Sequence, residues 1–112
     1  MLVILYNEEQ DFLTVTLQGF LVAKTTPLFE EALEKASICG KRHIVFQCAQ
    51  LSTFSSKGIG MLMAYLPYFE DRKISLTLAD LCPDIFYVLQ MLGLDRYMQL
   101  LVRETTDPSN LD

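Results

Sequence analysis

The fold of this chain is indicated most clearly by residues 54–63, which read Phe54-Ser55-Ser56-Lys57-Gly58-Ile59-Gly60-Met61-Leu62-Met63. Ser55 or Ser56 can cap a helix, because a side-chain oxygen there accepts a hydrogen bond from an unpaired amide of the first turn. Gly58 and Gly60 fall inside that turn, where each costs about 1 kcal/mol relative to alanine. Two glycines at this cost indicate that the backbone has to be free of side chains here, either for close packing or for a docking surface.

Two interpretations of this segment remain open at the level of sequence. One is a tight junction between a loop and a helix, with no further role. The other is a hydroxyl group presented at a helix N-terminus, where an added negative charge is favourably placed.

The composition is that of one globular domain. The chain has 112 residues, of which 51% are hydrophobic and 21% charged, enough for a single core without disulfides or metal. The formal net charge of −5 argues against nucleic acid as a partner, because phosphate contacts need clustered Lys and Arg. The basic clusters are Lys41-Arg42-His43 and Arg72-Lys73, and both look like solvated segments leading into strands.

Membrane insertion and secretion are not expected. No window approaches 18 apolar residues, the length that indicates a membrane-spanning helix, and the first residues lack the pattern of a signal peptide. Cys39, Cys48 and Cys82 form no CxxC motif and lie in or beside apolar runs. We expect reduced thiols there, which fits a cytoplasmic location, and we expect no cofactor or metal.

Apolar periodicity distinguishes the expected strands from the expected helices. Strands are predicted over residues 1–6, 12–17, 44–46 and 74–78, and residues 98–102 are compatible with a strand or a short helix. Helices are predicted to begin at Pro27, after Ser55 or Ser56, and at Pro83. Gly40 is expected to end the first helix, Pro67 to kink or end the second, and Gly93 to cap the third.

Several finer expectations follow from the same pattern. Gly19 is expected to close an initial hairpin, residues 20–23 and 47–54 to be connectors, and residues 44–46 to be buried on both faces. The apolar stripes are Leu28, Phe29, Ala32, Leu33 and Ala36 in the first helix, Ile59, Leu62, Met63, Leu66 and Phe69 in the second, and Ile85, Val88, Leu89 and Leu92 in the third.

The order of these elements predicts an α/β fold. Strands separated by single helices indicate parallel pairing with right-handed crossovers, here added to an N-terminal hairpin. We expect a mixed sheet of four to five strands with three or more helices packed on it. Residues 1–103 are expected to form the domain, and the polar residues 104–112 a loose C-terminal tail.

Three marks occur in a fixed order along the chain: Gly19 after the second strand, Ser55-Ser56-Lys57-Gly58-Ile59-Gly60 opening the second helix, and Gly93-Leu94-Asp95 closing the third. With them, the chain from Leu2 to about Val102 resembles a STAS domain, the family of bacterial anti-sigma factor antagonists and of cytoplasmic domains of sulfate transporters. The resemblance is to the antagonist branch, whose pattern at the second helix is Asp-Ser-Ser-Gly-x-Gly, and it implies a STAS-like sheet.

The resemblance also implies a phosphorylation switch, from which this sequence departs. In the antagonist branch, the serine before the first glycine is phosphorylated by the anti-sigma factor, a serine kinase that binds the unphosphorylated antagonist. Aligned through Gly58 and Gly60, the family's aspartate falls on Ser55, its first serine on Ser56 and its phosphoacceptor on Lys57. Lysine has no hydroxyl, so Ser56 and Ser55 remain as the candidate acceptors.

Two binding functions follow from the resemblance. The first is a regulator that docks on an anti-sigma factor or related serine kinase through the second helix and its preceding loop. Its expected contacts are Phe54, Ser55, Ser56, Lys57, Gly58, Ile59 and Met61. The alternative is a STAS subunit of a membrane transporter, such as a lipid-transport ATPase complex, which needs no phosphorylation.

An enzyme is not expected. His43 and Cys48 are five residues apart on one predicted strand, so their side chains point to opposite faces and do not form a nucleophile–base pair. Asp80 and Asp84 are explained better by helix capping than by cation binding. The sequence contains no phosphate-binding loop of the Walker type.

Overall fold

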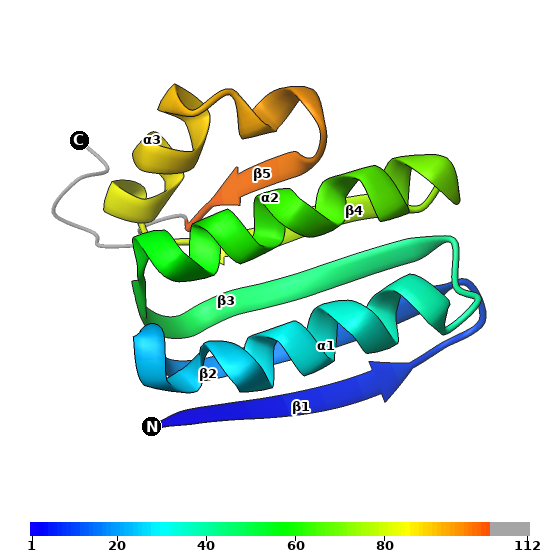
Figure 1. Cartoon of the computed structure of the whole chain (residues 1–112), viewed down its shortest axis with the longest axis horizontal. Helices are drawn as coiled ribbons and strands as arrows, with labels where there is room; N and C mark the ends of the chain where they lie inside the picture. Colours follow the sequence, from blue (N-terminus) through cyan, green and yellow to red (C-terminus); the bar gives the residue numbers. More distant parts are fainter. Residues whose placement is uncertain (104–112) are drawn as a thin grey trace, which may run out of the picture.

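The computed structural model describes residues 1–103, so the predicted tail at 104–112 lies outside the described residues. The described chain forms one five-stranded sheet in the order β1-β2-β3-β4-β5, with helices packed on it (Figure 1). The elements are β1 (Leu2–Glu8), β2 (Phe12–Leu21), η1 (Ala23–Thr25), α1 (Thr26–Ile38), β3 (His43–Phe54), α2 (Ser56–Asp71), β4 (Ser75–Leu81), α3 (Pro83–Met91), η2 (Leu94–Arg96) and β5 (Gln99–Val102). The predicted α/β class with an N-terminal hairpin is confirmed.

The sheet is mixed because only its first strand runs against the others. β1 pairs with β2 in the antiparallel sense, and β2–β3, β3–β4 and β4–β5 are parallel. The undecided segment at residues 98–102 is therefore a strand, β5. β2, β3 and β4 run in the same direction, so their carboxyl ends lie at one end of the sheet. The helical segments η1–α1, α2 and α3 begin at this end.

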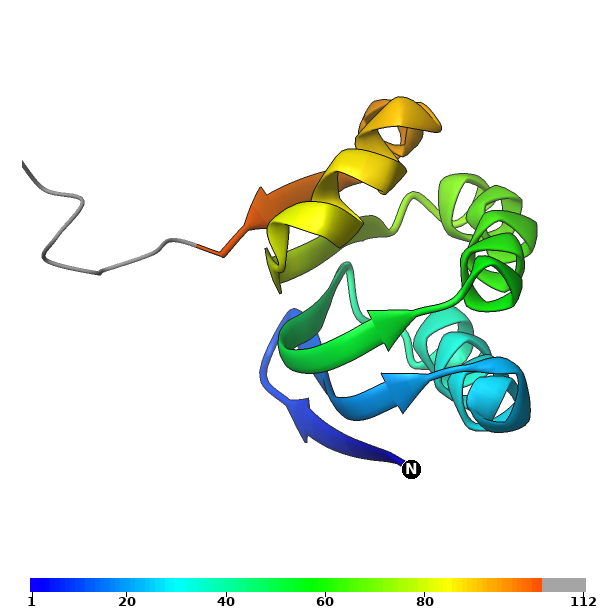
Figure 2. The same ribbon diagram turned by 90° about the vertical axis from the view of Figure 1, so that its left-hand side faces the viewer.

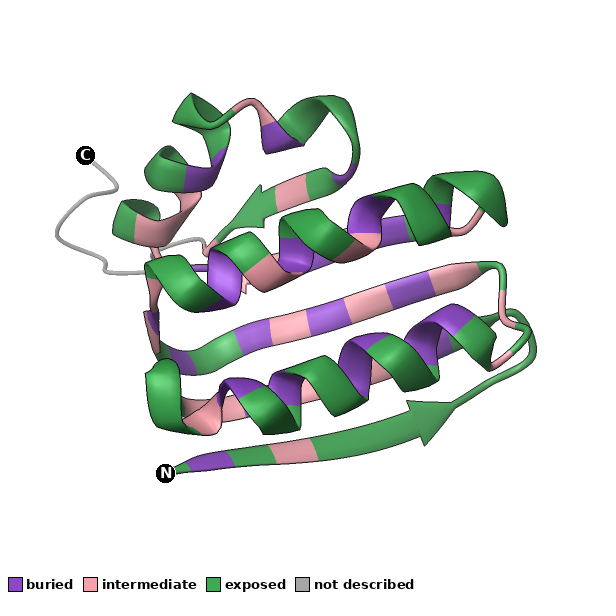
Figure 3. Ribbon diagram, in the orientation of Figure 1, coloured by how far each residue is buried: buried purple, intermediate pink, exposed green. Residues whose placement is uncertain are grey.

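The core lies between one face of the sheet and the helices. Figure 2 shows α1 and α2 on the same side of the strands, and their buried residues face the sheet (Figure 3). Along β3, Ile44 and Phe46 are fully buried whereas Val45 between them is half-buried. The expectation that residues 44–46 are buried on both faces is therefore wrong, because the helices cover one face only.

Residues 47–54 and the first half of residues 20–23, both expected to be connectors, belong to strands. β2 continues to Leu21 and β3 continues to Phe54, because residues 18–21 pair with residues 50–54 across two register shifts. The polar residues of this part of β3 include Gln50 and Ser52, which are exposed and so cost no burial of polar groups. β1 likewise runs to Glu8, two residues beyond the predicted strand at 1–6, because Glu8 pairs with Leu13.

Gly19 lies inside β2, opposite Leu2, and does not close the hairpin. Its φ is +111°, and a Cβ atom built on it would lie 2.2 Å from the carbonyl oxygen of Met1. Glycine is needed here for two reasons: the left-handed backbone region and the close approach of β1.

The helices differ from the expectations at several positions. Thr25 is the N-cap of α1, and α2 continues through Pro67 to Asp71. Met63 is 43% exposed, because the buried side of α2 is set by Ile59, Leu62, Leu66 and Phe69 and Met63 lies on the flank.

The third helix is also more exposed than its sequence indicates. Leu89 is its one buried residue, and Val88 and Leu92 are exposed. The four-residue strand β5 gives this helix only a narrow surface to cover. Gly93 caps the helix end with a φ of +79°, and Leu94 is buried after it, as predicted.

Replacing Gly19 with alanine tests the close approach of β1 and β2. We expect Gly19→Ala to lower the free energy of unfolding by more than about 1 kcal/mol, because the new methyl group meets the Met1 carbonyl in a strained backbone conformation. Urea unfolding followed by circular dichroism measures the change. Gly60→Ala is the matched control: nothing lies within 4 Å of its added Cβ, so stability should rise by about 1 kcal/mol. Equal effects of both substitutions would contradict this account of Gly19.

Candidate functional site

The N-terminus of α2 is built by a serine cap that is tied to the sheet. Ser55 has an extended backbone, and its Oγ accepts a hydrogen bond from the Gly58 N–H at 3.2 Å. The Ser55 N–H donates to the Leu21 carbonyl at 2.9 Å. Of the two serines proposed as caps, the structure selects Ser55. The cap thus joins the ends of β2 and β3 to the first turn of α2.

The two glycines of the first turns have different roles. A Cβ atom on Gly58 would lie 3.0 Å from Leu21 Cγ and 3.2 Å from Phe54 Cε1, so bare backbone here permits close packing of α2 on the strand ends. Gly60 is exposed, with nothing within 4 Å of an added Cβ. Close packing therefore explains Gly58 and leaves Gly60 unexplained.

The residues predicted to contact a partner divide into buried and accessible ones. Phe54, Gly58 and Ile59 are buried and hold α2 on the sheet. Ser56 and Lys57 are exposed, and Ser55 and Met61 are half-buried. Gly60, which is not among the predicted contacts, is also exposed. The spacing of Gly60 from Ser56 is the one sequence signal that indicates it.

The accessible residues form one continuous patch, which we name the α2 N-terminal surface and define as Ser56, Lys57, Gly60 and Met61. Gly60 follows Ser56, and Met61 follows Lys57, at a spacing of four residues, so each pair lies on one side of the helix. The first turn of α2 contains no acidic residue, and among residues 1–103 Lys57 is in no ion pair. Lys57 and the amide end of the helix therefore both contribute positive charge to this surface.

The structure does not bring His43 and Cys48 together as a catalytic pair. His43 is half-buried and stacks on Phe12 with ring centroids 4.8 Å apart. Cys48 is 1% exposed. Burial, with a smaller contribution from the Asp80 carboxylate, raises the pKa of the Cys48 thiol to about 12. A thiol that stays protonated at neutral pH is a poor nucleophile.

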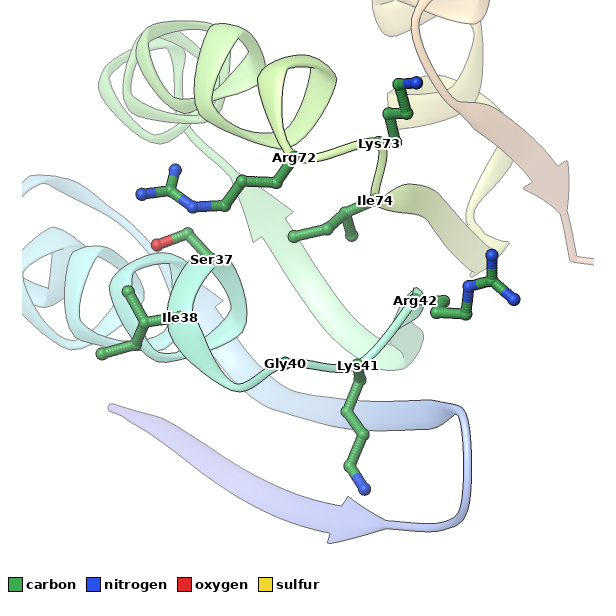
Figure 4. Close-up of a pocket in the computed structure, with 8 residues that line it drawn as sticks. All are labelled: Ser37, Ile38, Gly40, Lys41, Arg42, Arg72, Lys73 and Ile74. Carbon is green, nitrogen blue, oxygen red and sulfur yellow. The ribbon is translucent and has the colours of Figure 1, made fainter.

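A hollow of about 580 Å³ lies at the opposite end of the sheet, where β3 and β4 begin. It is lined by Ser37, Ile38, Gly40, Lys41, Arg42, Arg72, Lys73 and Ile74. Figure 4 shows that Lys41, Arg42 and Lys73 point away from one another, and that Arg72 extends towards Ser37. The two basic clusters of the sequence thus meet around this hollow, but their charged groups do not converge on one point.

Neither a metal-binding cluster nor a membrane-spanning helix occurs in the part of the chain that the structure describes. Residues 1–103 contain no group of three or more His, Cys, Asp or Glu side chains placed to hold a metal ion. No helix in this range is both long and apolar enough to cross a bilayer.

The sheet order and the capped helix define an α/β domain with an N-terminal hairpin and an exposed helix N-terminus at the carboxyl edge of its parallel strands. The family model of the STAS domain matches residues 4–108. The chain therefore belongs to the STAS domain family. Among curated proteins, no sequence matches the chain significantly.

Solved structures share this fold at low sequence identity. An anti-sigma factor antagonist from Mycobacterium paratuberculosis is 18% identical, with a TM-score of 0.77 over 96% of this chain and 89% of that one. An anti-sigma-factor antagonist (STAS) domain protein from Planctomyces limnophilus is 15% identical, with a TM-score of 0.74 over 90% of both chains. The Bacillus cell fate determinant SpoIIAA in its phosphorylated form is 18% identical, with a TM-score of 0.70 over 96% of both chains.

The cap predicts different effects for the two adjacent serines. Ser55→Ala removes the acceptor for the Gly58 N–H. We therefore expect the free energy of unfolding to fall by about 1 kcal/mol and Tm to fall by about 4–8 °C. Ser56→Ala is the matched control, because Ser56 is exposed and its hydroxyl bonds to no other residue among 1–103. Thermal unfolding followed by circular dichroism compares the two variants. A larger effect at Ser56 would show that the cap is wrongly assigned.

Proposed function

We propose that this chain is a non-enzymatic cytoplasmic regulator that resembles an anti-sigma factor antagonist and binds an anti-sigma factor or related serine kinase. The α2 N-terminal surface is the docking site. Membership of the STAS family and the shared fold with anti-sigma factor antagonists support this proposal. The observation that carries it is that Ser56, Lys57 and Gly60 are exposed, with half-buried Met61 beside them, on a helix whose start is capped.

The chemistry of the patch indicates the kind of partner surface it fits. Lys57 and the helix N-terminus attract an acidic partner surface, which speeds association and sets orientation. Met61 adds a flexible apolar contact, and the bare backbone at Gly60 allows a partner side chain to approach closely. The buried residues Phe54, Gly58 and Ile59 contribute by holding the patch rigid.

Binding is proposed to proceed without a phosphorylation switch at position 57, where lysine stands in place of the acceptor serine. Of the two neighbouring candidates, Ser56 is the more suitable acceptor, because its hydroxyl is exposed. The Ser55 oxygen is half-buried and already accepts the cap hydrogen bond.

Charge reversal at the two ends of α2 tests the docking site. We expect Lys57→Glu to weaken partner binding at least about fivefold, because it repels the acidic surface that the wild type attracts. Folding is not impaired, since an acidic residue is favoured at a helix N-terminus. The experiment captures the partner from native extract with the immobilised wild type, identifies it by mass spectrometry, and compares affinities by calorimetry.

Asp71→Lys is the matched control for this substitution. Asp71 is exposed at the last position of the same helix, where a cation is favourable, so binding should stay at the wild-type level. Equal weakening by both substitutions would argue against this docking site. Capture of an ATPase with a permease, in place of a kinase, would favour the alternative of a transporter subunit.

Restoring a hydroxyl at position 57 tests the missing switch. With the captured kinase and ATP, we expect the wild type to keep its unmodified mass and stay bound. We expect Lys57→Ser to gain one phosphate and dissociate, because the acceptor then stands at the aligned position. Intact-mass measurement and size-exclusion chromatography record both results. A complete single phosphorylation of the wild type at Ser56 or Ser55 would defeat the proposal of unswitched binding.

A further inference from the structure

The outer edge of β1 offers a row of backbone groups to a further strand. β1 is the first strand of the sheet, and no other strand among residues 1–103 pairs with its outer edge. The Phe20 N–H bonds to the Met1 carbonyl, and the Glu9 N–H bonds to the Phe12 carbonyl. Hydrogen-bonded and non-hydrogen-bonded pairs alternate along an antiparallel ladder. The backbone N–H and C=O groups of the odd-numbered residues of β1 therefore point towards β2. The N–H and C=O groups of Leu2, Ile4, Tyr6 and Glu8 therefore point outward.

This edge has few of the features that usually prevent strands from pairing between molecules. β1 is seven residues long, LVILYNE, without proline or lysine, and its register with β2 runs without a bulge. Val3 is 41% exposed and Leu5 52% exposed. A long, regular, apolar edge strand is a template for another strand.

A stripe on α1 lies beside this edge. Leu28, Glu31, Lys35 and Ile38 are all exposed, at 45% for Leu28 and 71% for Ile38. Two hollows run along the seam between α1 and β1, and Tyr6 and Lys35 line both of them. Glu31 and Lys35 form an ion pair at 3.7 Å midway along the stripe.

The stripe and the strand run in the same direction and share a midpoint. α1 leads back from the end of β2 to the start of β3, so it runs antiparallel to β2 and along β1 (Figure 1). Lys35 Nζ lies 4.6 Å from the Tyr6 ring centroid. Burial and then the Glu31 carboxylate raise the pKa of the Tyr6 hydroxyl. Tyr6 thus lies beside the Glu31–Lys35 pair. Leu5, the neighbour of Tyr6, lies at the middle of β1 and opposite the middle of the α1 stripe.

We propose that two copies of this chain associate about a two-fold axis that passes beside Leu5, with their β1 strands paired antiparallel. In this register Leu2 pairs with Glu8 of the second copy, and Ile4 pairs with Tyr6 of the second copy. The backbone N–H and C=O groups of all four residues point outward from the sheet, so they can form the hydrogen bonds between the two copies. The same axis makes the two α1 stripes antiparallel. It places Leu28 opposite Ile38 of the second copy and Glu31 opposite Lys35.

The pairing is self-complementary in both layers, which is why a second copy is the occupant that fits. In the sheet layer each outward N–H meets an outward C=O, and two exposed Leu5 side chains meet at the axis. In the helix layer Leu28 of each copy meets Ile38 of the other, and the Glu31 carboxylate of each copy meets the Lys35 ammonium group of the other. The α2 N-terminal surface lies on α2, two strands away from the new interface, so a dimer presents two docking sites.

Sedimentation velocity and light scattering test the dimer with the full chain. We expect the wild type to approach twice its mass of 12.8 kDa as the concentration rises to ~1 mM, the range in which weak association is detected. Glu31→Lys and Lys35→Glu each place like charges across the axis, so each should weaken self-association at least about tenfold.

Mixing these two variants gives the decisive measurement. Glu31→Lys carries two lysines in its stripe, and Lys35→Glu carries two glutamates, so an equimolar mixture should form heterodimers at a concentration at which each variant alone stays monomeric. Leu5→Lys should also abolish the dimer, because two ammonium groups then meet at the axis. Glu34→Lys is the matched control: Glu34 is exposed on α1 outside the stripe, and the dimer should persist.

Circular dichroism confirms that each variant is folded before its mass is interpreted. A wild type that stays monomeric at the highest concentration would overturn the proposal. A dimer unchanged in both charge variants, or a mixture that forms no heterodimer, would overturn this interface.

Discussion

The contact between Gly58 and the ends of two strands positions everything that we assign to function. A methyl group at Gly58 would lie 3.0 Å from Leu21 and 3.2 Å from Phe54, so only glycine lets α2 approach the sheet this closely without displacing a neighbour. The Ser55 cap holds the same junction by hydrogen bonds to Leu21 and Gly58. With the buried side of the first turn held in this way, Ser56, Lys57 and Gly60 face the solvent. The proposed docking surface is thus a consequence of core packing.

Coverage of one face of the sheet explains the surfaces that remain. The residues of β2 and β3 alternate between a buried face under α1 and α2 and a half-buried face without a helix. The first helix covers β1 only in part, which leaves the α1 stripe and the β1 edge exposed together. Two separate surfaces therefore serve two separate purposes: one end of α2 is proposed to bind a partner protein, and β1 a second copy.

The accuracy of the predictions differed between local and long-range features. Caps, glycine turns and the order of elements depend on neighbouring residues, and a cap at Ser55 or Ser56, the cap at Gly93 and the initial hairpin were predicted. Residues 20–23 and 47–54 were predicted as connectors because they are short or polar. Residues 20–21 and 47–54 form strand instead, and residues 20–21 do so by pairing with residues 53–54, whereas Ala23 begins η1 as part of the connection. Met63 and Val88 satisfy a helical apolar pattern, but neither is buried, since burial depends on which elements lie opposite.

The sequence by itself determined the α/β class, the STAS family and the helix start at residues 55–60, because these depend on periodicity and on spacing along the chain. Lys57 in place of the family's acceptor serine is also a fact of sequence. Only the tertiary structure decided which of those residues a partner can reach: Phe54, Gly58 and Ile59 are buried, and Gly60 is exposed. It also placed Tyr6 beside Lys35, residues 29 positions apart that no local pattern connects. Exposure and juxtaposition arise from packing between distant segments, and a linear pattern does not specify them.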